Sequence, residues 1–214
     1  ACVDCIVNIP CMATRLSNIS VFLVLALTLL ALGYMLYQFT ARKNSLPVLG
    51  EPGHMAGDFS FTNQDGQVVT RQMVDGKTTV VEYFFTTCPG ICKIMNRNLQ
   101  TIHDTFKNDS NLVILSHTVN PETDSVPVMA AYAKTFGAEA PSWQLLTGDK
   151  TALYKAARED YLLAVEDSAK NKDFIHTEYV ALVDGKRRVR GFYDATQKES
   201  IDKLAADIRK LLND

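Results

Sequence analysis

The sequence predicts an α/β domain with a central mixed sheet, preceded by one transmembrane helix. Two observations lead to this prediction. Segments rich in β-branched and aromatic residues alternate with segments whose apolar residues recur at helical spacing, which is typical of a sheet covered by helices. Separately, a run near the amino terminus is apolar over a length that can span a bilayer.

The composition excludes several classes of protein. Hydrophobic residues make up 47% of the 214 residues and charged residues 21%, which is too apolar for a disordered chain. Lys and Arg number 22 against 24 acidic residues, so the basic excess of a nucleic-acid binder is missing and we expect no nucleic-acid partner. Five cysteines are too few for a small fold built on disulfides.

The apolar run predicts a membrane anchor over residues 19–39. Residues 16–41 carry no charge, and Tyr34, Tyr37 and Phe39 lie at one end, where aromatic side chains prefer the membrane interface. A signal peptide is the alternative, but its apolar region usually covers only ~7–15 residues before a small-x-small cleavage site. We therefore divide the chain into an N-terminal segment (1–18), the anchor (19–39), a tether (40–57) and a working domain (58–214).

Three cysteines precede the anchor. Cys2 and Cys5 have the spacing of half a zinc site, but no second half follows at zinc spacing. The chain begins with Ala, and Met12 is a plausible start that would remove Cys2, Cys5 and Cys11. We interpret these three cysteines as incidental.

The working domain alternates strands and helices. A hairpin is expected around Asp65-Gly66, and Asp184-Gly185 separates two later strands. The Pro- and Gly-containing stretch before residue 58 indicates a tether rather than packed structure. Strands are predicted at 59–62, 68–70, 78–85, 112–119, 179–183 and 189–192, and helices at 92–106, 126–136, 150–161 and 200–212.

The chemistry concentrates in Thr87-Cys88-Pro89-Gly90-Ile91-Cys92, where a strand gives way to a helix. Pro89 suits the first helical turn, which would place Cys88 at the helix start and Cys92 about one turn along the same face. A helix N-terminus favours thiolate over thiol. Two sulfurs held in this way can form a disulfide or share a soft metal ion; two buried cysteines used as small hydrophobes are the alternative.

The spacing differs from the C-x-x-C of thioredoxin-type oxidoreductases, so we looked for a third metal ligand among the four histidines. His54 lies in the predicted tether, and His103 is expected on the exposed part of a helix. His117 shares a strand face with apolar residues, which indicates a packed side chain. His176 directly precedes a strand, a loop position that can meet another element, but its position alone does not decide between ligand and ordinary loop residue.

Four motifs together resemble the Sco (SenC) family. They are Phe85-Thr86-Thr87-Cys88-Pro89-Gly90-Ile91-Cys92, Thr118-Val119-Asn120-Pro121-Glu122-Thr123-Asp124, Leu146-Thr147-Gly148-Asp149 and Asp173-Phe174-Ile175-His176-Thr177, in the family's order and spacing over roughly residues 58–214. The family consists of membrane-tethered, thioredoxin-fold copper proteins of cytochrome c oxidase assembly.

The resemblance implies a thioredoxin-like fold and a copper site made by Cys88, Cys92 and His176, with the two cysteines also forming a redox-active disulfide pair. It implies that cytochrome c oxidase subunit II is the partner, with another copper chaperone or a thioredoxin-like reductant as a further one. Soft thiolates select Cu(I), and imidazole completes a site for Cu(I) or Cu(II). Zinc is chemically possible, but a structural zinc site normally has a fourth protein ligand.

The chain departs from the family pattern at two positions. Lys93 stands where the family usually has proline, and Asn120 stands where it usually has aspartate. Neither change removes a copper ligand. Lys93 adds positive charge near the thiolates, and Asn120 leaves Asp124 as the family-like carboxylate.

We therefore expect a copper chaperone that assists assembly of the dinuclear copper centre of the oxidase, rather than an enzyme of the usual kind. Two alternatives stay open: a thiol–disulfide reductase acting on the oxidase cysteines, and a redox sensor. The charges flanking the anchor, Arg15 on one side and Arg42 and Lys43 on the other, do not decide its orientation. Because no Arg- and Ser-rich targeting segment precedes the anchor, we expect a bacterial cytoplasmic membrane with the domain on the extracytoplasmic side.

Overall fold

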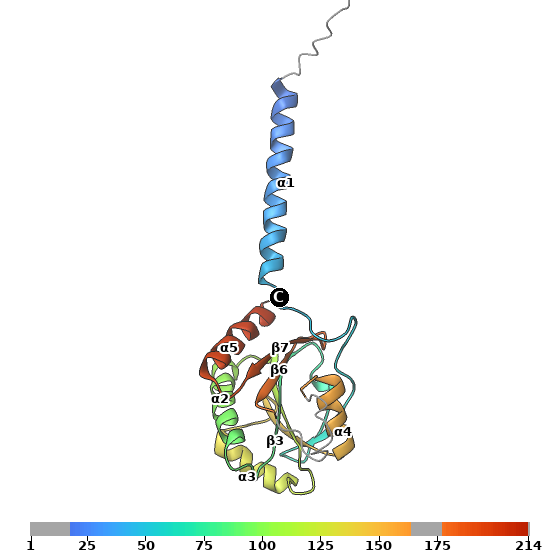
Figure 1. Ribbon diagram of the computed structural model, residues 1–214, viewed down its shortest axis with the longest axis vertical. Helices are drawn as coiled ribbons and strands as arrows, with labels where there is room; N and C mark the ends of the chain where they lie inside the picture. The colour runs from blue at the N-terminus through green and yellow to red at the C-terminus, as the bar shows by residue number, and fades with distance from the viewer. Residues whose placement is uncertain (1–17, 164–176, 214) are drawn as a thin grey trace, which may run out of the picture. The chain divides into compact units, whose positions relative to one another are not determined.

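The computed structural model describes residues 18–163 and 177–213, which fall into two units that meet between Ser45 and Leu46. The first unit contains helix α1 (Asn18–Asn44; Figure 1). Its stretch Ser20–Gln38 is long and apolar enough to cross a membrane, and none of it is buried inside the protein. The core helix of a soluble domain would be mostly buried, whereas a signal sequence would share these properties.

The second unit is built on one seven-stranded mixed sheet with the order β2-β1-β5-β4-β3-β6-β7. Strand β3 lies near the centre, parallel to β4 and antiparallel to β6, while β5 is parallel to β4. The two antiparallel hairpins β1–β2 and β6–β7 form the edges. The strands span Ser60–Asn63 (β1), Val68–Thr70 (β2), Thr78–Phe84 (β3), Leu112–Thr118 (β4), Trp143–Thr147 (β5), Tyr179–Val183 (β6) and Val189–Asp194 (β7).

Helices cover both faces of the sheet. Figure 1 shows α2, α3 and α5 on one face and α4 on the other. A short 3₁₀-helix, Arg71–Met73, follows β2. The helices span Ile91–Phe106 (α2), Val126–Phe136 (α3), Lys150–Lys155 (α4, continued by a π-helix over Ala156–Asp160) and Lys198–Leu212 (α5).

The sheet therefore has two hydrophobic cores. All residues of β3 are buried, and they alternate between the faces as the strand period requires. Val80 and Phe84 pack with the two cysteines beneath α2, α3 and α5. Val81 and Tyr83 pack on the opposite side beneath α4. Thioredoxin-like architecture with a central mixed sheet, as predicted from the sequence, is confirmed.

One central strand was not predicted. β5 carries a single β-branched residue, Thr147, and contains a glutamine, so its local composition is a weak strand signal. Gln144 is nevertheless buried, because its side-chain oxygen accepts a hydrogen bond from Asn63 of the neighbouring strand at 3.1 Å. Pairing with β1 and β4, not local propensity, makes this segment a strand.

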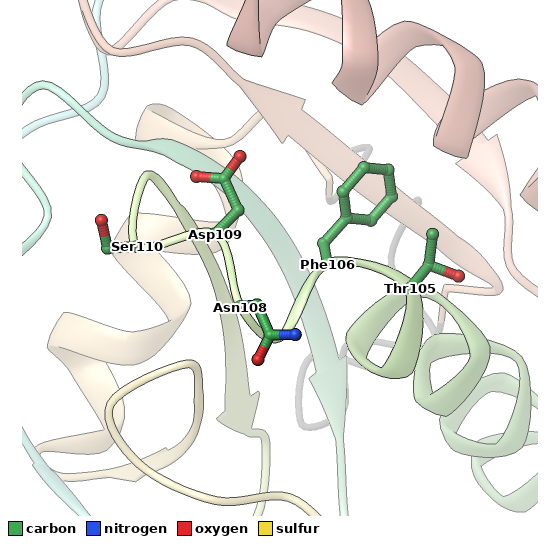
Figure 2. Close-up of a pocket in the computed structure, with 5 residues that line it drawn as sticks. All are labelled: Thr105, Phe106, Asn108, Asp109 and Ser110. Atoms are coloured by element: carbon green, nitrogen blue, oxygen red, sulfur yellow. The ribbon is translucent and has the colours of Figure 1, made fainter.

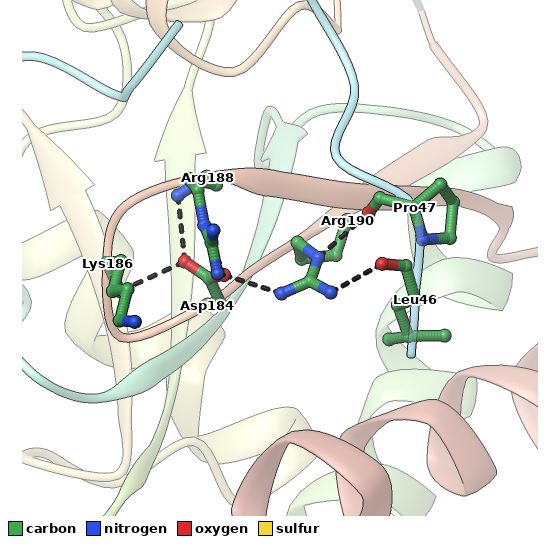
Figure 3. Close-up of polar contacts among 6 residues, drawn as sticks. All are labelled: Leu46, Pro47, Asp184, Lys186, Arg188 and Arg190. Carbon is green, nitrogen blue, oxygen red and sulfur yellow. Dashed lines mark hydrogen bonds and ion pairs between the residues drawn. The ribbon is translucent and has the colours of Figure 1, made fainter. Parts of the chain in front are cut away.

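Part of the segment that we expected to be a tether is packed on the domain. The guanidinium of Arg190, itself buried, donates hydrogen bonds to the carbonyl oxygens of Leu46 (2.5 Å) and Pro47 (2.8 Å) and pairs with Asp184 at 2.7 Å (Figure 3). The amide of Leu49 donates to the carbonyl of Val189. This Pro- and Gly-containing segment therefore packs along the edge strand β7, and the buried guanidinium satisfies two of the segment's carbonyl groups.

Candidate metal and thiol centre

Cys88 and Cys92 lie together at the carboxyl end of β3, beneath the start of α2. Both residues are only 4% exposed and belong to the core that contains Val80 and Phe84. Both are free thiols in the structure. The predicted pairing of two sulfurs at a strand–helix junction is therefore present, with the sulfurs covered from solvent.

The helix begins one residue before the predicted range 92–106, but Pro89 does not lie in its first turn as expected. α2 starts at Ile91 with Gly90 as its N-cap, so Pro89 belongs to the preceding turn and not to the helix. Gly90 has no side chain to satisfy the first amides. The sulfur of Cys88 acts as an acceptor instead: it accepts a hydrogen bond from the backbone N–H of Cys92 at 3.5 Å.

The two thiols are electrostatically unequal. Burial opposes ionisation of Cys88, but hydrogen bonds from the Cys92 thiol and from the backbone N–H groups of Cys92, Gly90 and Ile91 outweigh it and hold the pKa of Cys88 below its ordinary value. Burial, followed by the hydrogen bond to Cys88, raises the pKa of Cys92 to about 12. Cys88 is thus the sulfur of the pair that ionises more readily, and Cys92 is the thiol that donates to it.

Asp124 fixes the loop that carries Cys88. This carboxylate is fully buried, and its Oδ1 accepts a hydrogen bond from the hydroxyl of Thr86 at 2.5 Å. Its Oδ2 accepts from the Thr86 amide at 3.2 Å and from the hydroxyl of Thr118, the last residue of β4, at 2.5 Å. Because β3 and β4 are parallel, their carboxyl ends meet at one edge of the sheet, and Asp124 joins the two loops there.

Asn120 has a structural place in the same turn. Its amide donates to the hydroxyl of Thr118 at 2.9 Å, and its carbonyl oxygen accepts from the amides of Thr123 and Asp124. The family-atypical asparagine therefore supports the turn through its backbone, and Asp124 is the carboxylate that contacts the cysteine loop.

A second buried carboxyl, Glu82, lies under the cysteines and was not identified from the sequence. It points to the same face of β3 as Val80 and Phe84, and its Oε1 accepts a hydrogen bond from Ser116 at 2.5 Å, while Trp143 donates to Ser116 at 2.8 Å. Its Oε2 is buried and has no partner among the described residues. Burial raises the pKa of Glu82 to about 7.

Glu82 and Tyr132 surround Cys92 with polar groups inside an otherwise apolar core. Asn96 links Cys92 to Tyr132, since its side-chain amide donates to the Cys92 carbonyl at 2.8 Å and to the Tyr132 hydroxyl at 3.3 Å. Burial, and then the negative charge of Glu82, raise the pKa of Tyr132. A single acidic residue inside the apolar strand Thr78–Phe84 was the sequence signal that could have revealed Glu82.

The four histidines have different environments. His117 is fully buried among the aromatic rings of the α4 face, so the prediction of a packed strand histidine is confirmed. The expectation that His103 is exposed was wrong: it is 7% exposed, and its Nε2 lies 2.8 Å from the Ser142 hydroxyl. His54 contacts the Asp160 carbonyl at 3.0 Å. His176, the predicted third ligand, lies outside the described residues.

The described residues thus offer a metal ion two sulfur ligands, which do not make a complete ligand set. No group of three His, Cys, Asp or Glu side chains placed to hold a metal occurs among residues 18–163 and 177–213. The donor chemistry of the pair is soft, and one sulfur is already biased towards thiolate, which suits Cu(I). A hollow lined by Thr105, Phe106, Asn108, Asp109 and Ser110 lies at the other end of α2 and contains no sulfur or imidazole (Figure 2).

Comparison with known proteins agrees with this architecture. The sequence model of the SCO1/SenC family matches residues 48–213. The chain belongs to the SCO1/SenC family. It is 24% identical over 153 residues to the SCO1 protein homolog of Bacillus subtilis, which covers 71% of this chain and 79% of that protein.

Solved structures of Sco proteins share the fold. A structure of BsSco, described as a member of the Sco family of cytochrome c oxidase assembly proteins with a disulfide switch, superposes with a TM-score of 0.64 at 22% identity, over 77% of this chain and 96% of that one. ScoI of Arabidopsis thaliana, crystallised with copper bound, gives a TM-score of 0.58 at 28% identity, over 73% of this chain and 99% of that one.

Proposed function

We propose that this protein binds copper through Cys88, Cys92 and His176 and acts as a copper chaperone. The observation that carries the proposal is the pair of buried, hydrogen-bonded sulfurs at the start of α2. Membership of the SCO1/SenC family and the copper-bound structure of the Arabidopsis relative support copper as the metal. His176 is assigned by its match to the family motif.

The chemistry of the pair suits a transferable metal ion. Cu(I) needs only two or three soft ligands, and two thiolates with one imidazole leave coordination positions at which an acceptor can bind. Copper is therefore cargo in this proposal. Both thiols must lose their protons when the metal binds, so metal affinity depends on pH and is lost when the cysteines are oxidised to a disulfide.

The proposed acceptor is the dinuclear copper centre of cytochrome c oxidase subunit II. Family membership and the description of BsSco as an oxidase assembly protein support this choice. Helix α1 would anchor the protein in the membrane, with the domain on the extracytoplasmic side of a bacterial cytoplasmic membrane. An alkaline phosphatase fused to the carboxyl end should be active; a stable but inactive fusion would overturn this topology.

Thiol–disulfide exchange is the second candidate function, and the unequal thiols favour it. The Cys88 thiolate would attack a partner disulfide, displacing one partner sulfur as thiolate and forming a mixed disulfide. Cys92, after losing its proton, would then attack Cys88 and release the second partner sulfur. The partner gains two electrons, and Cys88 and Cys92 end as a disulfide.

The variant His176→Ala separates the two functions. It leaves both sulfurs in place, so dithiol chemistry should persist, whereas copper should be held more weakly, with Cu(II) affected most because Cu(I) tolerates two-coordinate sulfur ligation. The measurement is competition for Cu(I) and Cu(II) by graded chelators, beside a disulfide-reduction assay. His54→Ala is the matched control, because the only hydrogen bond of the His54 side chain within the described residues is the one to the Asp160 carbonyl. Unchanged affinity for both copper ions together with lost reductase activity would overturn the copper chaperone.

A further inference from the structure

The solvent-facing side of the first two turns of α2 carries two large apolar side chains next to the buried cysteines. Ile91 is 39% exposed and Ile94 is 47% exposed, although both follow directly on the loop that carries Cys88. Cys92 and Met95 of the same turns point inward and are buried. Ile91 directly precedes Cys92 and Ile94 follows it by two residues, so a partner that docks on this side of the helix lies next to the cysteine pair.

Two cations flank the apolar centre. Lys93 and Arg97 are exposed and lie four residues apart, so they are neighbours along the helix surface with Ile94 between them. Neither forms an ion pair with any residue that the structure describes, whereas Lys150 and Lys198 pair with Glu122 and Asp202. We call Ile91, Lys93, Ile94 and Arg97 the α2 outer face.

The charges that α2 itself carries around the α2 outer face are positive. Within α2 the first acidic residue is Asp104, about two turns beyond Arg97. The backbone N–H groups at the start of the helix, which donate to the Cys88 sulfur, add partial positive charge at the same end. The nearby carboxyl groups Glu82 and Asp124 are fully buried, and Asp124 is hydrogen-bonded to Thr86 and Thr118.

We propose that the α2 outer face is the docking surface for an acidic protein partner, which it brings to the sulfur of Cys88. An apolar centre with a charged rim is the usual composition of a protein interface, and unpaired cations at the rim raise the association rate of an anionic partner. The inference rests on the proposed function in one respect, namely that the cysteine pair exchanges metal or electrons with another protein.

A second copy of this chain fits the surface poorly. In a twofold-symmetric contact centred on α2, the Lys93 and Arg97 of one copy would approach those of the other, and like charges would oppose association. An acidic partner removes that repulsion and supplies the ion pairs that these cations lack within the described part of the chain.

Two activated peptides test the proposal. Each contains one cysteine joined to neutral 2-thiopyridine and two leucines; one peptide has four glutamates and the other four lysines. The Cys88 thiolate attacks the peptide sulfur, the peptide–pyridyl S–S bond breaks, and pyridine-2-thione leaves and is measured by its absorbance. The full chain is used in a nonionic maltoside micelle, in a background with Cys2, Cys5 and Cys11 changed to Ser.

We expect the acidic peptide to react about 10-fold faster than the basic one at low salt. The ratio should fall towards one at about 1 M salt, where the Debye length is only ~3 Å. Lys93→Glu with Arg97→Glu should invert the preference. Ile94→Ser should slow both peptides equally, since it removes apolar contact and no charge. A neutral dipeptide probe should react within about 2-fold in every variant, which excludes a change in the thiolate itself.

Lys107→Glu is the matched control for charge. Lys107 follows the same helix, is exposed, and lies ~15 Å beyond Arg97 along the axis, outside a Debye length of ~8–10 Å. It should leave the peptide preference unchanged. An equal effect of Lys107→Glu, or a preference that survives reversal at Lys93 and Arg97, would overturn the proposal. No rate here involves copper, so a failed copper titration bears on the proposed function alone.

Discussion

The two faces of the sheet bury titratable groups on neighbouring strands in different ways. On the α2 face, Glu82 of β3 accepts a hydrogen bond from Ser116, which in turn accepts one from Trp143. On the α4 face, His117 of β4 has neither ring nitrogen hydrogen-bonded within the described residues. It packs instead against aromatic rings, stacked on Tyr83 at 5.1 Å and edge-on to Phe61 at 5.5 Å.

Burial favours the neutral form of both groups, and it shifts their pKa values in opposite directions. Burial raises the pKa of Glu82 to about 7 and lowers the pKa of His117 to about 3. On the face that carries the thiols, Glu82 therefore titrates near neutral pH, whereas His117 on the other face stays neutral there. The difference shows that burial of one group places a titration near neutral pH beside the thiols and that burial of the other removes one.

Removing His117 should have the largest effect on stability. Its folded pKa of about 3 lies below the ordinary 6.5, so the unfolded state binds more protons and stability falls as the pH drops from 6.5 towards 3. The full window of 3.5 units corresponds to about 5 kcal/mol. In His117→Phe, and in His117→Leu as a second replacement, urea unfolding of residues 46–214 at pH 7.5 and pH 4 should lose about 3 kcal/mol of this dependence. An unchanged pH dependence in both variants would contradict the assignment.

Glu82→Gln tests the effect of burial on the α2 face of the sheet. The folded pKa of about 7 lies above the ordinary 4.5, so the unfolded state binds fewer protons between these values and stability falls as the pH rises from 4.5 to 7. Neutral glutamine removes a cost of about 3 kcal/mol at pH 8 and has no such effect at pH 4. The check is urea unfolding at both pH values. If Glu82→Gln were less stable than the unaltered protein at pH 8, the negative charge of Glu82 would be compensated by its surroundings, and the prediction would be wrong.

Asp124→Asn tests whether the α2 face holds the cysteine loop through its carboxylate. Loss of the charge weakens hydrogen bonds from Thr86 and Thr118 and should destabilise the domain by about 2 kcal/mol while increasing the alkylation rate of Cys88. Asp149→Ala is the control, because Asp149 also accepts a backbone hydrogen bond, from Ala152 at 2.8 Å, but as the cap of α4. It should cost about 1 kcal/mol and leave Cys88 unchanged.

The smallest expected effect concerns the thiols themselves. At pH 8, Cys88 should react with iodoacetamide about 10-fold faster than Cys92, since the thiolate is the nucleophile and hydrogen bonds favour it on Cys88. Peptide mapping after limited alkylation of residues 46–214 measures the ratio. Cys92→Ala removes the donor thiol and should move the Cys88 titration to higher pH. Equal rates in the unaltered protein would show that the two sulfurs share their protons evenly.

Local sequence determined much of the architecture. The spacing of apolar residues predicted the helix Val126–Phe136 and the strand Tyr179–Val183 at their observed bounds, because the period of a helix or strand is visible in consecutive residues. The position of the cysteines at a strand–helix junction was predicted for the same reason. The proposed role of His176 still rests on the sequence motif, because that residue lies outside the described part of the chain.

Only tertiary structure decided what surrounds the cysteines. Glu82, Ser116 and Trp143 come from three strands, and their hydrogen bonds exist only because β3, β4 and β5 lie side by side. Asp124 reaches Thr86 across 38 residues of sequence for the same reason. Periodicity fixes which face a side chain occupies, but burial, hydrogen-bond partners and pKa depend on neighbours that are distant in the chain, and these set the properties of the two sulfurs.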